Sequence, residues 1–306
     1  MNLYLKKYTA WILTSLVSLS LLVSGLLNLP LHNVSAAVLT VPSIFSNNAV
    51  LQRNMPVPIF GTAAPGATVT VNFQGQNVST TAVAGTGKWQ VNLASMSAST
   101  SPSNLVITSG SESLTLTGVQ VGEVWDCSGQ SNMVKELSAV YEGPAAAADA
   151  PNHNIRLFME ASGGTPTGVT WTVADATTAG AFSAVCYFFG YKLSQTLQPA
   201  NLPIGLIQAA TVGTTIQTWT HYNGSSGVQY DTQVKPIQPY AIRGVNWYQG
   251  ESNSGDSFYA EYLTALIAEW RADWGEGNFP FQFVQIIRAG KAFRGGRFSG
   301  LSIRRM

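Results

Sequence analysis

The residues best suited to chemistry lie in residues 122–133, which read GEVWDCSGQSNM. An apolar run typical of a β-strand passes into small and polar residues, and a segment compatible with a helix begins at Asn132. Ser131 would then lie at the carboxyl end of a strand, beside backbone N–H groups that can face a developing negative charge. Gln130 adds an amide, and Gly129 permits close backbone approach. This arrangement suits an acyl-transfer nucleophile, although an ordinary glycine-rich turn has the same composition.

Two further stretches end in the same manner. Residues 245–253 read VNWYQGESN, an apolar run that opens into glycine, an amide, a carboxylate and a hydroxyl. Residues 203–207 form a third apolar run, which is followed by a polar segment around Gly213. In an α/β fold, the carboxyl ends of neighbouring parallel strands meet at one edge of the sheet. We therefore expect the three loops to meet.

These stretches resemble the sialate O-acetylesterases, a family within the SGNH-type (GDSL-like) hydrolases. The resemblance runs from about residue 41 to about residue 287, in the family's order. The blocks that carry it are Phe45-Ser46 with Asn48, residues 50–53, Val124-Trp125, residues 127–133, Gly213-Thr214 with Ile216 and Trp219, residues 247–253, Trp270-Arg271 with Trp274, and residues 279–281. The chain departs from the family at Val212, where a glycine is usual, and at Asp126, where an apolar residue is usual.

The resemblance implies a serine mechanism without a cofactor. Ser131 would attack an acetyl ester, and water would then hydrolyse the acetyl-enzyme. The oxyanion would be held by the N–H groups of Ser131 and Gly213 and by the side-chain amide of Gln249. Asn253 and Gln130 are further candidates for oxyanion or substrate binding. No spacing of histidine, cysteine and acidic residues suits a metal, and no phosphate-binding loop is present.

The general base is the weak point of this mechanism, because a serine hydroxyl is a poor nucleophile alone. In the resembled family the base is a histidine in an Asp-x-His setting near the C-terminus, and no such motif occurs in this sequence. His32 lies in the N-terminal leader, and neither His153 nor His221 matches the family's position. Glu251 would orient a base, or accept a structural hydrogen bond in its loop. We expect weak or absent turnover.

Four segments are predicted. Residues 1–36 read as a secretory signal, with an apolar stretch behind two lysines and a small-residue site before Ala37; an uncleaved membrane anchor is the alternative. Residues 37–117 hold short alternating strands typical of an all-β sandwich. Residues 118–287 alternate strand and helix, as in a parallel sheet covered on both faces. The chain is expected to be secreted or attached to the cell surface, without stable membrane insertion after signal cleavage.

The last segment, 288–306, contains six lysine or arginine residues, no acidic residue and no apolar period. It reads as a disordered basic tail, or as the end of a truncated or frame-shifted product of a longer family member. We favour the second interpretation.

The two cysteines, Cys127 and Cys186, belong to an exported chain, but their spacing does not reveal whether they form a bridge. Cys186 lies in an apolar-periodic helix pattern, which favours a buried free thiol. Within the sandwich segment, Phe73 and Trp89 are expected to be core residues rather than a platform for sugars.

Charged residues make up 10% of the chain and the net charge is +1, so nothing indicates a nucleic-acid partner. Three functions compete. The first is removal of O-acetyl groups from sialic acid, and the second is the same chemistry on another acetylated glycan such as xylan. The third is an inactive fragment that at most binds glycans.

Overall fold

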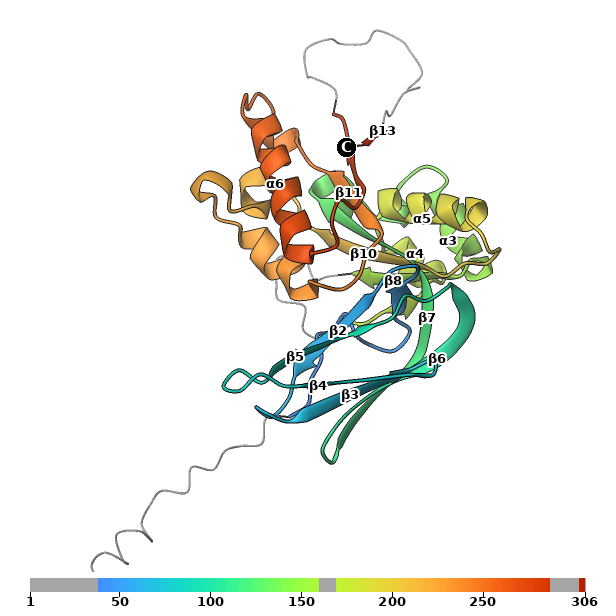
Figure 1. Cartoon of the computed structure of the whole chain (residues 1–306). Coiled ribbons are helices and arrows are strands. Elements are labelled where there is room, and N and C mark those ends of the chain that lie inside the picture. The colour runs from blue at the N-terminus through green and yellow to red at the C-terminus, as the bar shows by residue number, and fades with distance from the viewer. Residues whose placement is uncertain (1–37, 160–168, 287–302, 306) are drawn as a thin grey trace, which may run out of the picture. The chain divides into compact units, whose positions relative to one another are not determined.

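The computed structural model describes residues 38–159, 169–286 and 303–305 (Figure 1). The predicted signal (1–36) lies outside the described residues, as does the predicted basic tail apart from 303–305. No helix among the described residues is both long and apolar enough to cross a membrane.

A mostly parallel sheet forms the centre of the fold. Its parallel strands follow the order β12-β11-β7-β10-β8, and a short antiparallel strand pairs at each edge, β13 beside β12 and β9 beside β8. The bounds are β7 (Glu112–Gly129), β8 (Ile155–Met159), β9 (Thr172–Val173), β10 (Ile204–Ala210), β11 (Gly244–Tyr248), β12 (Phe281–Val284) and β13 (Ile303–Arg305).

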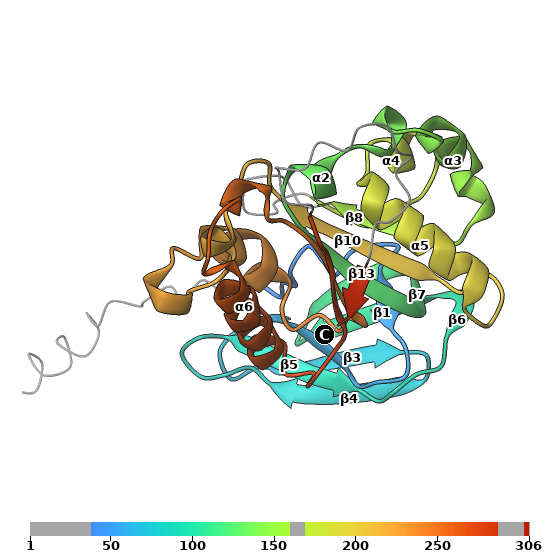
Figure 2. The same cartoon turned by 90° about the horizontal axis from the view of Figure 1, so that it is seen from above.

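Helices cover both faces of this sheet, which explains its nearly continuous apolar strands. Strand β10 is buried along its whole length. One face packs against α6 (Tyr259–Trp274) through Leu266 and Trp270. The other packs against α5 (Ala184–Thr196), near α3 (Gly143–Asp149) and α4 (Ala176–Gly180). Figure 2 shows α6 on one side of β7 and β10, and α5 on the other. The predicted three-layer α/β arrangement around a parallel sheet is confirmed.

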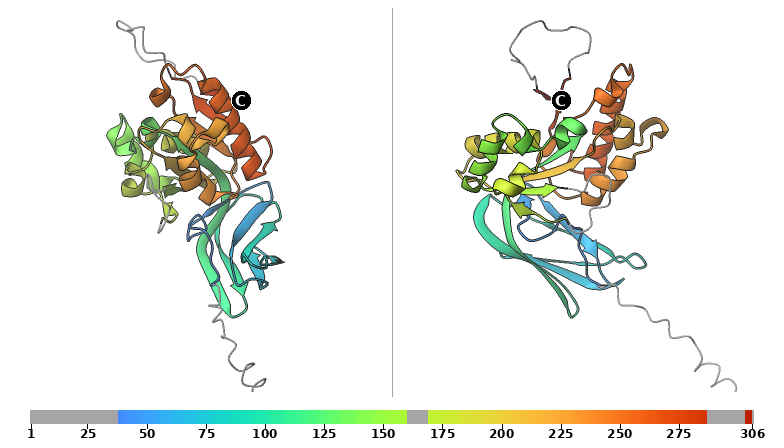
Figure 3. Two further views of the ribbon diagram at one scale, coloured as in Figure 1. Left: turned by 90° about the vertical axis from the view of Figure 1, so that its left-hand side faces the viewer. Right: turned by 180° about the vertical axis from the view of Figure 1, so that it is seen from behind.

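Strand β7 belongs to two different environments. Its residues alternate in burial as far as Gly118, and every residue from Val119 to Gly129 is buried. The first part pairs antiparallel with β6 (Ser99–Ser109), and the second lies between the parallel strands β10 and β11. Figure 3 shows the long strand continuing from one region into the other.

The other N-terminal strands are short and mostly antiparallel. Strands β3 and β4 pair with each other, β3 also pairs with β6, β2 pairs with β5, and β1 lies parallel to β7. Their bounds are β1 (Val50–Gln52), β2 (Val57–Thr62), β3 (Thr68–Phe73), β4 (Gln76–Thr81) and β5 (Lys88–Leu93). Phe73 and Trp89 are buried, as expected. A separate all-β domain ending at residue 117 stays a prediction, because β7 runs through that boundary.

Candidate active site

Ser131 begins the short helix α2 (Ser131–Val134), directly after the end of the central strand. At the turn, Gly129 has a φ of 142°, and a Cβ built on it would lie 2.1 Å from the carbonyl oxygen of Tyr248. The backbones of β7 and β11 are therefore too close for any side chain at this position. Gln130 N–H donates to the same carbonyl at 2.9 Å. The expected close backbone approach at Gly129 is confirmed.

The three loops meet, as expected, and Gln249 joins them. Its buried side-chain nitrogen lies within hydrogen-bonding distance of Gln130 Oε1 (3.0 Å), Thr214 O (3.0 Å) and Asn253 Oδ1 (2.8 Å). These acceptors come from the loops after β7, β10 and β11. Gln130 Oε1 also accepts from the N–H of Ser252 at 3.2 Å. The amide hydrogens of Gln249 therefore hold the loops together in this structure, while its oxyanion role stays a prediction.

Asn253 is equally engaged. Its Oδ1 accepts from the N–H of Ile216 at 2.9 Å, and its Nδ2 donates to Gln217 Oε1 at 2.9 Å and to Asp256 Oδ2 at 3.2 Å. Asn253 is only 8% exposed, and its hydrogen bonds to Ile216 and Gln217 hold the loop after β10 in place. Its substrate-binding role also stays a prediction.

Glu251 contacts the residue next to the candidate nucleophile. Its Oε1 accepts a hydrogen bond from Asn132 Nδ2. Its Oε2 is buried and has no hydrogen-bonding partner among the described residues. Glu251 thus positions the first turn of α2, and its free oxygen is able to take one further donor.

The predicted oxyanion donors include the backbone N–H groups of Ser131 and Gly213. No hydrogen bond from the N–H of Ser131 or Gly213 to a described residue is present, and Gly213 has a φ of 74° in an exposed turn. Ser131 lines a pocket of about 380 Å³. The other lining residues are Val134, Lys135, Glu136, Ala139 and Val212. Lys135, which directly follows α2, was not among the site residues predicted from the sequence.

The two histidines in the described residues make their contacts elsewhere. His153 Nε2 lies 2.8 Å from Asp149 Oδ2, and its Nδ1 lies 3.5 Å from Ser194 Oγ. His221 lies between Glu269 (2.7 Å) and Asp231 (3.1 Å), and hydrogen bonds to these carboxylates raise its pKa. No hydrogen bond joins either ring to Ser131 within the part of the chain that the structure describes.

Comparison with known proteins identifies the family. The family model for "carbohydrate esterase, sialic acid-specific acetylesterase" matches residues 121–298, which is more than half of the chain. The chain belongs to this carbohydrate esterase family. The match continues past residue 287, so the expectation that the resemblance ends there is wrong.

Similar proteins agree with the assignment of this chain to the family. The chain is 30% identical to human sialate O-acetylesterase, over 80% of this chain and 56% of the human protein. It is 28% identical to the mouse sialate O-acetylesterase, over 80% of this chain and 59% of the mouse protein. A carbohydrate acetylesterase from Xanthomonas citri has a similar structure, with a TM-score of 0.72 and 33% identity over 80% of this chain and 59% of that one. The chain thus spans little more than half the length of these relatives.

A disulfide lies in the strand that leads to the candidate site. Cys127 in β7 is bonded to Cys186 in the first turn of α5, with their Cα atoms 5.9 Å apart. The expectation of a buried free thiol at Cys186 is wrong. An apolar helix pattern indicates only that a sulfur is buried, and the pairing depends on how α5 packs on the sheet. The bridge fixes α5 to the strand that carries Ser131.

Asp126, the unusual residue in this strand, is fully buried. Its Oδ2 accepts from Ser128 Oγ at 2.7 Å, and its Oδ1 has no described partner. Burial raises the pKa of this carboxyl to about 7, against the smaller opposing effect of the Ser128 hydrogen bond. The strand end itself is regular, because Asp126 stays in register with Ile207 and Val245 on either side.

Proposed function

We propose that this chain carries the nucleophile half of a secreted esterase that removes O-acetyl groups from sialic acid. The observation that supports the proposal most is the position of Ser131, between a buried strand end and a pocket, with unengaged N–H groups on two neighbouring loops. The names of the family and of its human and mouse relatives suggest the substrate.

In the proposed reaction, Ser131 Oγ attacks the acetyl carbonyl carbon and loses its proton to a base. The N–H groups of Ser131 and Gly213 stabilise the resulting oxyanion. Collapse breaks the bond to the sugar oxygen, the sugar leaves with a proton, and water releases acetate from the acetyl-enzyme. Gln249 and Asn253 keep the loops at a fixed spacing, which preorganises these donors.

Turnover by this chain alone should be slow. The described histidines are bonded to carboxylates away from Ser131, and a serine attack without a general base loses on the order of 10²–10⁴ in rate. Glu251, through its free oxygen, is available to orient a base rather than to act as one. A chain of this kind is also able to bind glycans without hydrolysing them.

A second substrate class deserves the same assay. The similar structure from Xanthomonas citri is described as a carbohydrate acetylesterase, without reference to sialic acid. An acetylated polysaccharide such as xylan is therefore the alternative substrate, with the same serine chemistry.

The deciding experiment is chemical rescue by a soluble base. Acetate release from O-acetylated sialic acid and from acetylated xylan would be measured with and without imidazole, for the purified chain and for Ser131→Ala. We expect imidazole to raise the rate of the unaltered chain at least tenfold and to leave Ser131→Ala at background. A variant lacking both His153 and His221 should behave like the unaltered chain. Rescue of Ser131→Ala, or a folded chain that imidazole does not activate, would refute the proposed nucleophile.

A further inference from the structure

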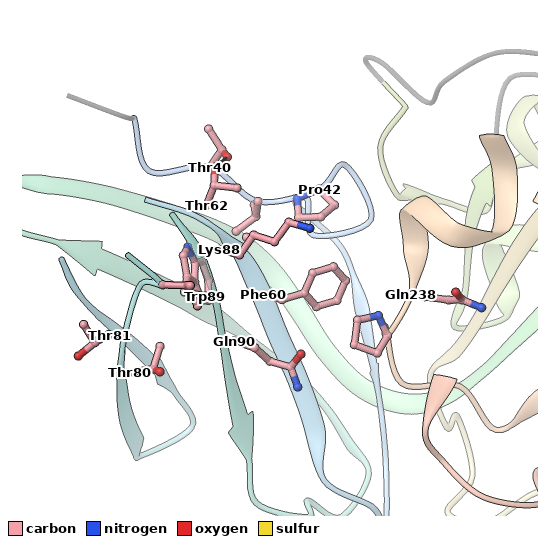
Figure 4. A pocket seen from close by; sticks show the side chains of 14 residues that line it. Thr40, Pro42, Phe60, Thr62, Thr80, Thr81, Lys88, Trp89, Gln90 and Gln238 are labelled. Atoms are coloured by element: carbon pink, nitrogen blue, oxygen red, sulfur yellow. Dashed lines mark hydrogen bonds between the residues drawn. The ribbon is translucent and has the colours of Figure 1, made fainter. Parts of the chain in front are cut away.

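A second, larger pocket lies away from Ser131, on the outward face of the β2–β5 ribbon (Figure 4). Its volume is about 760 Å³, within the range of pockets that hold small ligands. Phe60 lies opposite Gln90 in the ribbon, and Thr62 lies opposite Lys88. Side chains that are directly opposite in an antiparallel pair share one face, so these four form a continuous surface.

The pocket combines an aromatic floor with polar groups. Phe60 is partly exposed and is held in place by edge-to-face packing on Phe45, with ring centroids 5.1 Å apart. In Figure 4 the Phe60 ring lies between Lys88, Gln90 and Gln238. Trp89, which lies between Lys88 and Gln90 in β5, is largely buried and also lines the pocket.

Lys88 gives the pocket a positive charge. Its ammonium group forms no ion pair with a described residue, and no aspartate or glutamate lines the pocket. In Figure 4 the side chain extends along the pocket toward Pro42. An unpaired ammonium group at the edge of an apolar floor favours a ligand that brings both a carboxylate and an apolar face.

We propose that this pocket binds an acidic sugar residue of a glycan, separately from the esterase site. The C–H face of the sugar ring would lie on the negative face of Phe60, and its carboxylate would accept hydrogen bonds from Lys88. The side-chain amide of Gln90 donates to Asn92 Oδ1 at 3.2 Å. In the complex, this amide would donate to a sugar hydroxyl instead. The choice of a glycan as the ligand rests on the proposed function. The shape and charge of the pocket are independent of that function. Such a site would hold the esterase on its polymeric substrate.

The test is a titration of the ¹⁵N-labelled chain with 3′-sialyllactose and with lactose, followed through backbone amide shifts. We expect 3′-sialyllactose to shift amides of β2 and β5, and to bind about tenfold more tightly than lactose. Lys88→Met should remove that difference, and Phe60→Leu should weaken binding of both sugars. Lys235→Met, which alters an exposed lysine paired with Asp231, is the matched control and should bind like the unaltered chain.

Two results would overturn the proposal. One is the absence of shifts in β2 and β5 with either sugar, and the other is equal binding of lactose and 3′-sialyllactose by the unaltered chain. Imidazole-assisted acetate release from free O-acetylated sialic acid should be unchanged in Lys88→Met, because that substrate does not need the second site. If the unaltered chain shows no sugar-dependent shifts in β2 and β5 but releases acetate with imidazole, the pocket proposal alone is refuted. If the unaltered chain binds 3′-sialyllactose at β2 and β5 but releases no acetate with imidazole, the esterase proposal alone is refuted.

Discussion

At the scale of single residues, the candidate site contains two buried side-chain amides that hydrogen-bond across its loops. Gln249 bonds to acceptors on three loops, and Asn253 bonds to four groups around it. Hydrogen bonds between buried groups are strengthened by the low local dielectric, although Gln249 Oε1 itself has no partner among the described residues. Gln249, which the sequence predicts as an oxyanion donor, therefore holds neighbouring loops together in this structure.

Replacing Gln249 should test this structural task. In Gln249→Leu, Thr214 O loses its described side-chain donor, whereas Gln130 Oε1 and Asn253 Oδ1 keep one backbone donor each. We expect the free energy of unfolding to fall by about 2–3 kcal/mol, measured by urea denaturation. Gln195→Leu, at an exposed position of α5, is the control and should change it by less than about 0.5 kcal/mol. An equally small effect at Gln249 would show that the loops do not depend on this amide.

Asp126 should make stability depend on pH. Its folded pKa of about 7 lies above its ordinary value of 3.8, so the folded chain keeps a proton that the unfolded chain has lost. Between about pH 4 and pH 7 the free energy of unfolding therefore falls as the pH rises. Burial of Glu276 raises that residue's pKa to about 8 and contributes in the same direction.

Asp126→Asn isolates the first contribution, because its side-chain oxygen still accepts from Ser128. We expect the variant to be more stable than the unaltered chain at pH 7.5, on the order of 2–4 kcal/mol, and nearly equal at pH 4. Urea denaturation at the two pH values measures the difference. A pH-independent difference would mean that Asp126 is not protonated in the folded chain.

At the scale of elements, the approach of β7 to β11 leaves no space at Gly129. An alanine Cβ there would lie 2.1 Å from Tyr248 O, whereas at Gly255, with a φ of 88°, it would meet nothing within 4 Å. Both substitutions carry backbone strain, so their difference measures the steric clash. We expect Gly129→Ala to lower the melting temperature by at least about 6 °C more than Gly255→Ala, in a scanning calorimeter. Equal losses would show that the strands are able to separate.

The disulfide should stabilise the contact between β7 and α5. It links residues 59 positions apart, and closing a loop of that length removes about 4 kcal/mol of unfolded-state entropy in the simplest treatment. We expect a reducing agent to lower the urea midpoint of the unaltered chain. The pair Cys127→Ala with Cys186→Ala should have a low midpoint that the reducing agent leaves unchanged. A midpoint that is insensitive to reduction in the unaltered chain would argue against the bond.

The strands themselves were largely predictable from local sequence. The segments that each strand packs against were not. The apolar runs at 155–159 and 204–209 predict β8 and β10 closely, because strands buried on both faces need continuous apolar residues. The predicted boundary after residue 117 divides β7, because Gly118 reads as a break between strands. Gly122 lies inside the same strand, where a Cβ would lie 2.0 Å from Pro203 O, a contact no local pattern contains.

At the scale of the molecule, β7 makes the N-terminal strands and the central sheet share one core. The same hydrophobic cluster contains Val71 of β3 together with Trp247 of β11 and Phe281 of β12. A continuous strand and a common core oppose independent unfolding of the two regions. Residues 37–117 and 118–287 should therefore unfold together, even if they are separate domains by architecture.

Val71→Ala tests that coupling from the N-terminal side. Val71 is fully buried, and its truncation should cost about 1–3 kcal/mol. Six of the eight tryptophans lie between residues 125 and 274, so near-UV circular dichroism follows mainly the central sheet and its helices. We expect Val71→Ala to lower the near-UV and far-UV midpoints by the same amount. Val173→Ala, at an exposed position of β9, should lower neither. If only the far-UV midpoint moves, the N-terminal strands unfold alone, and β7 does not transmit their stability to the strand end that carries Ser131.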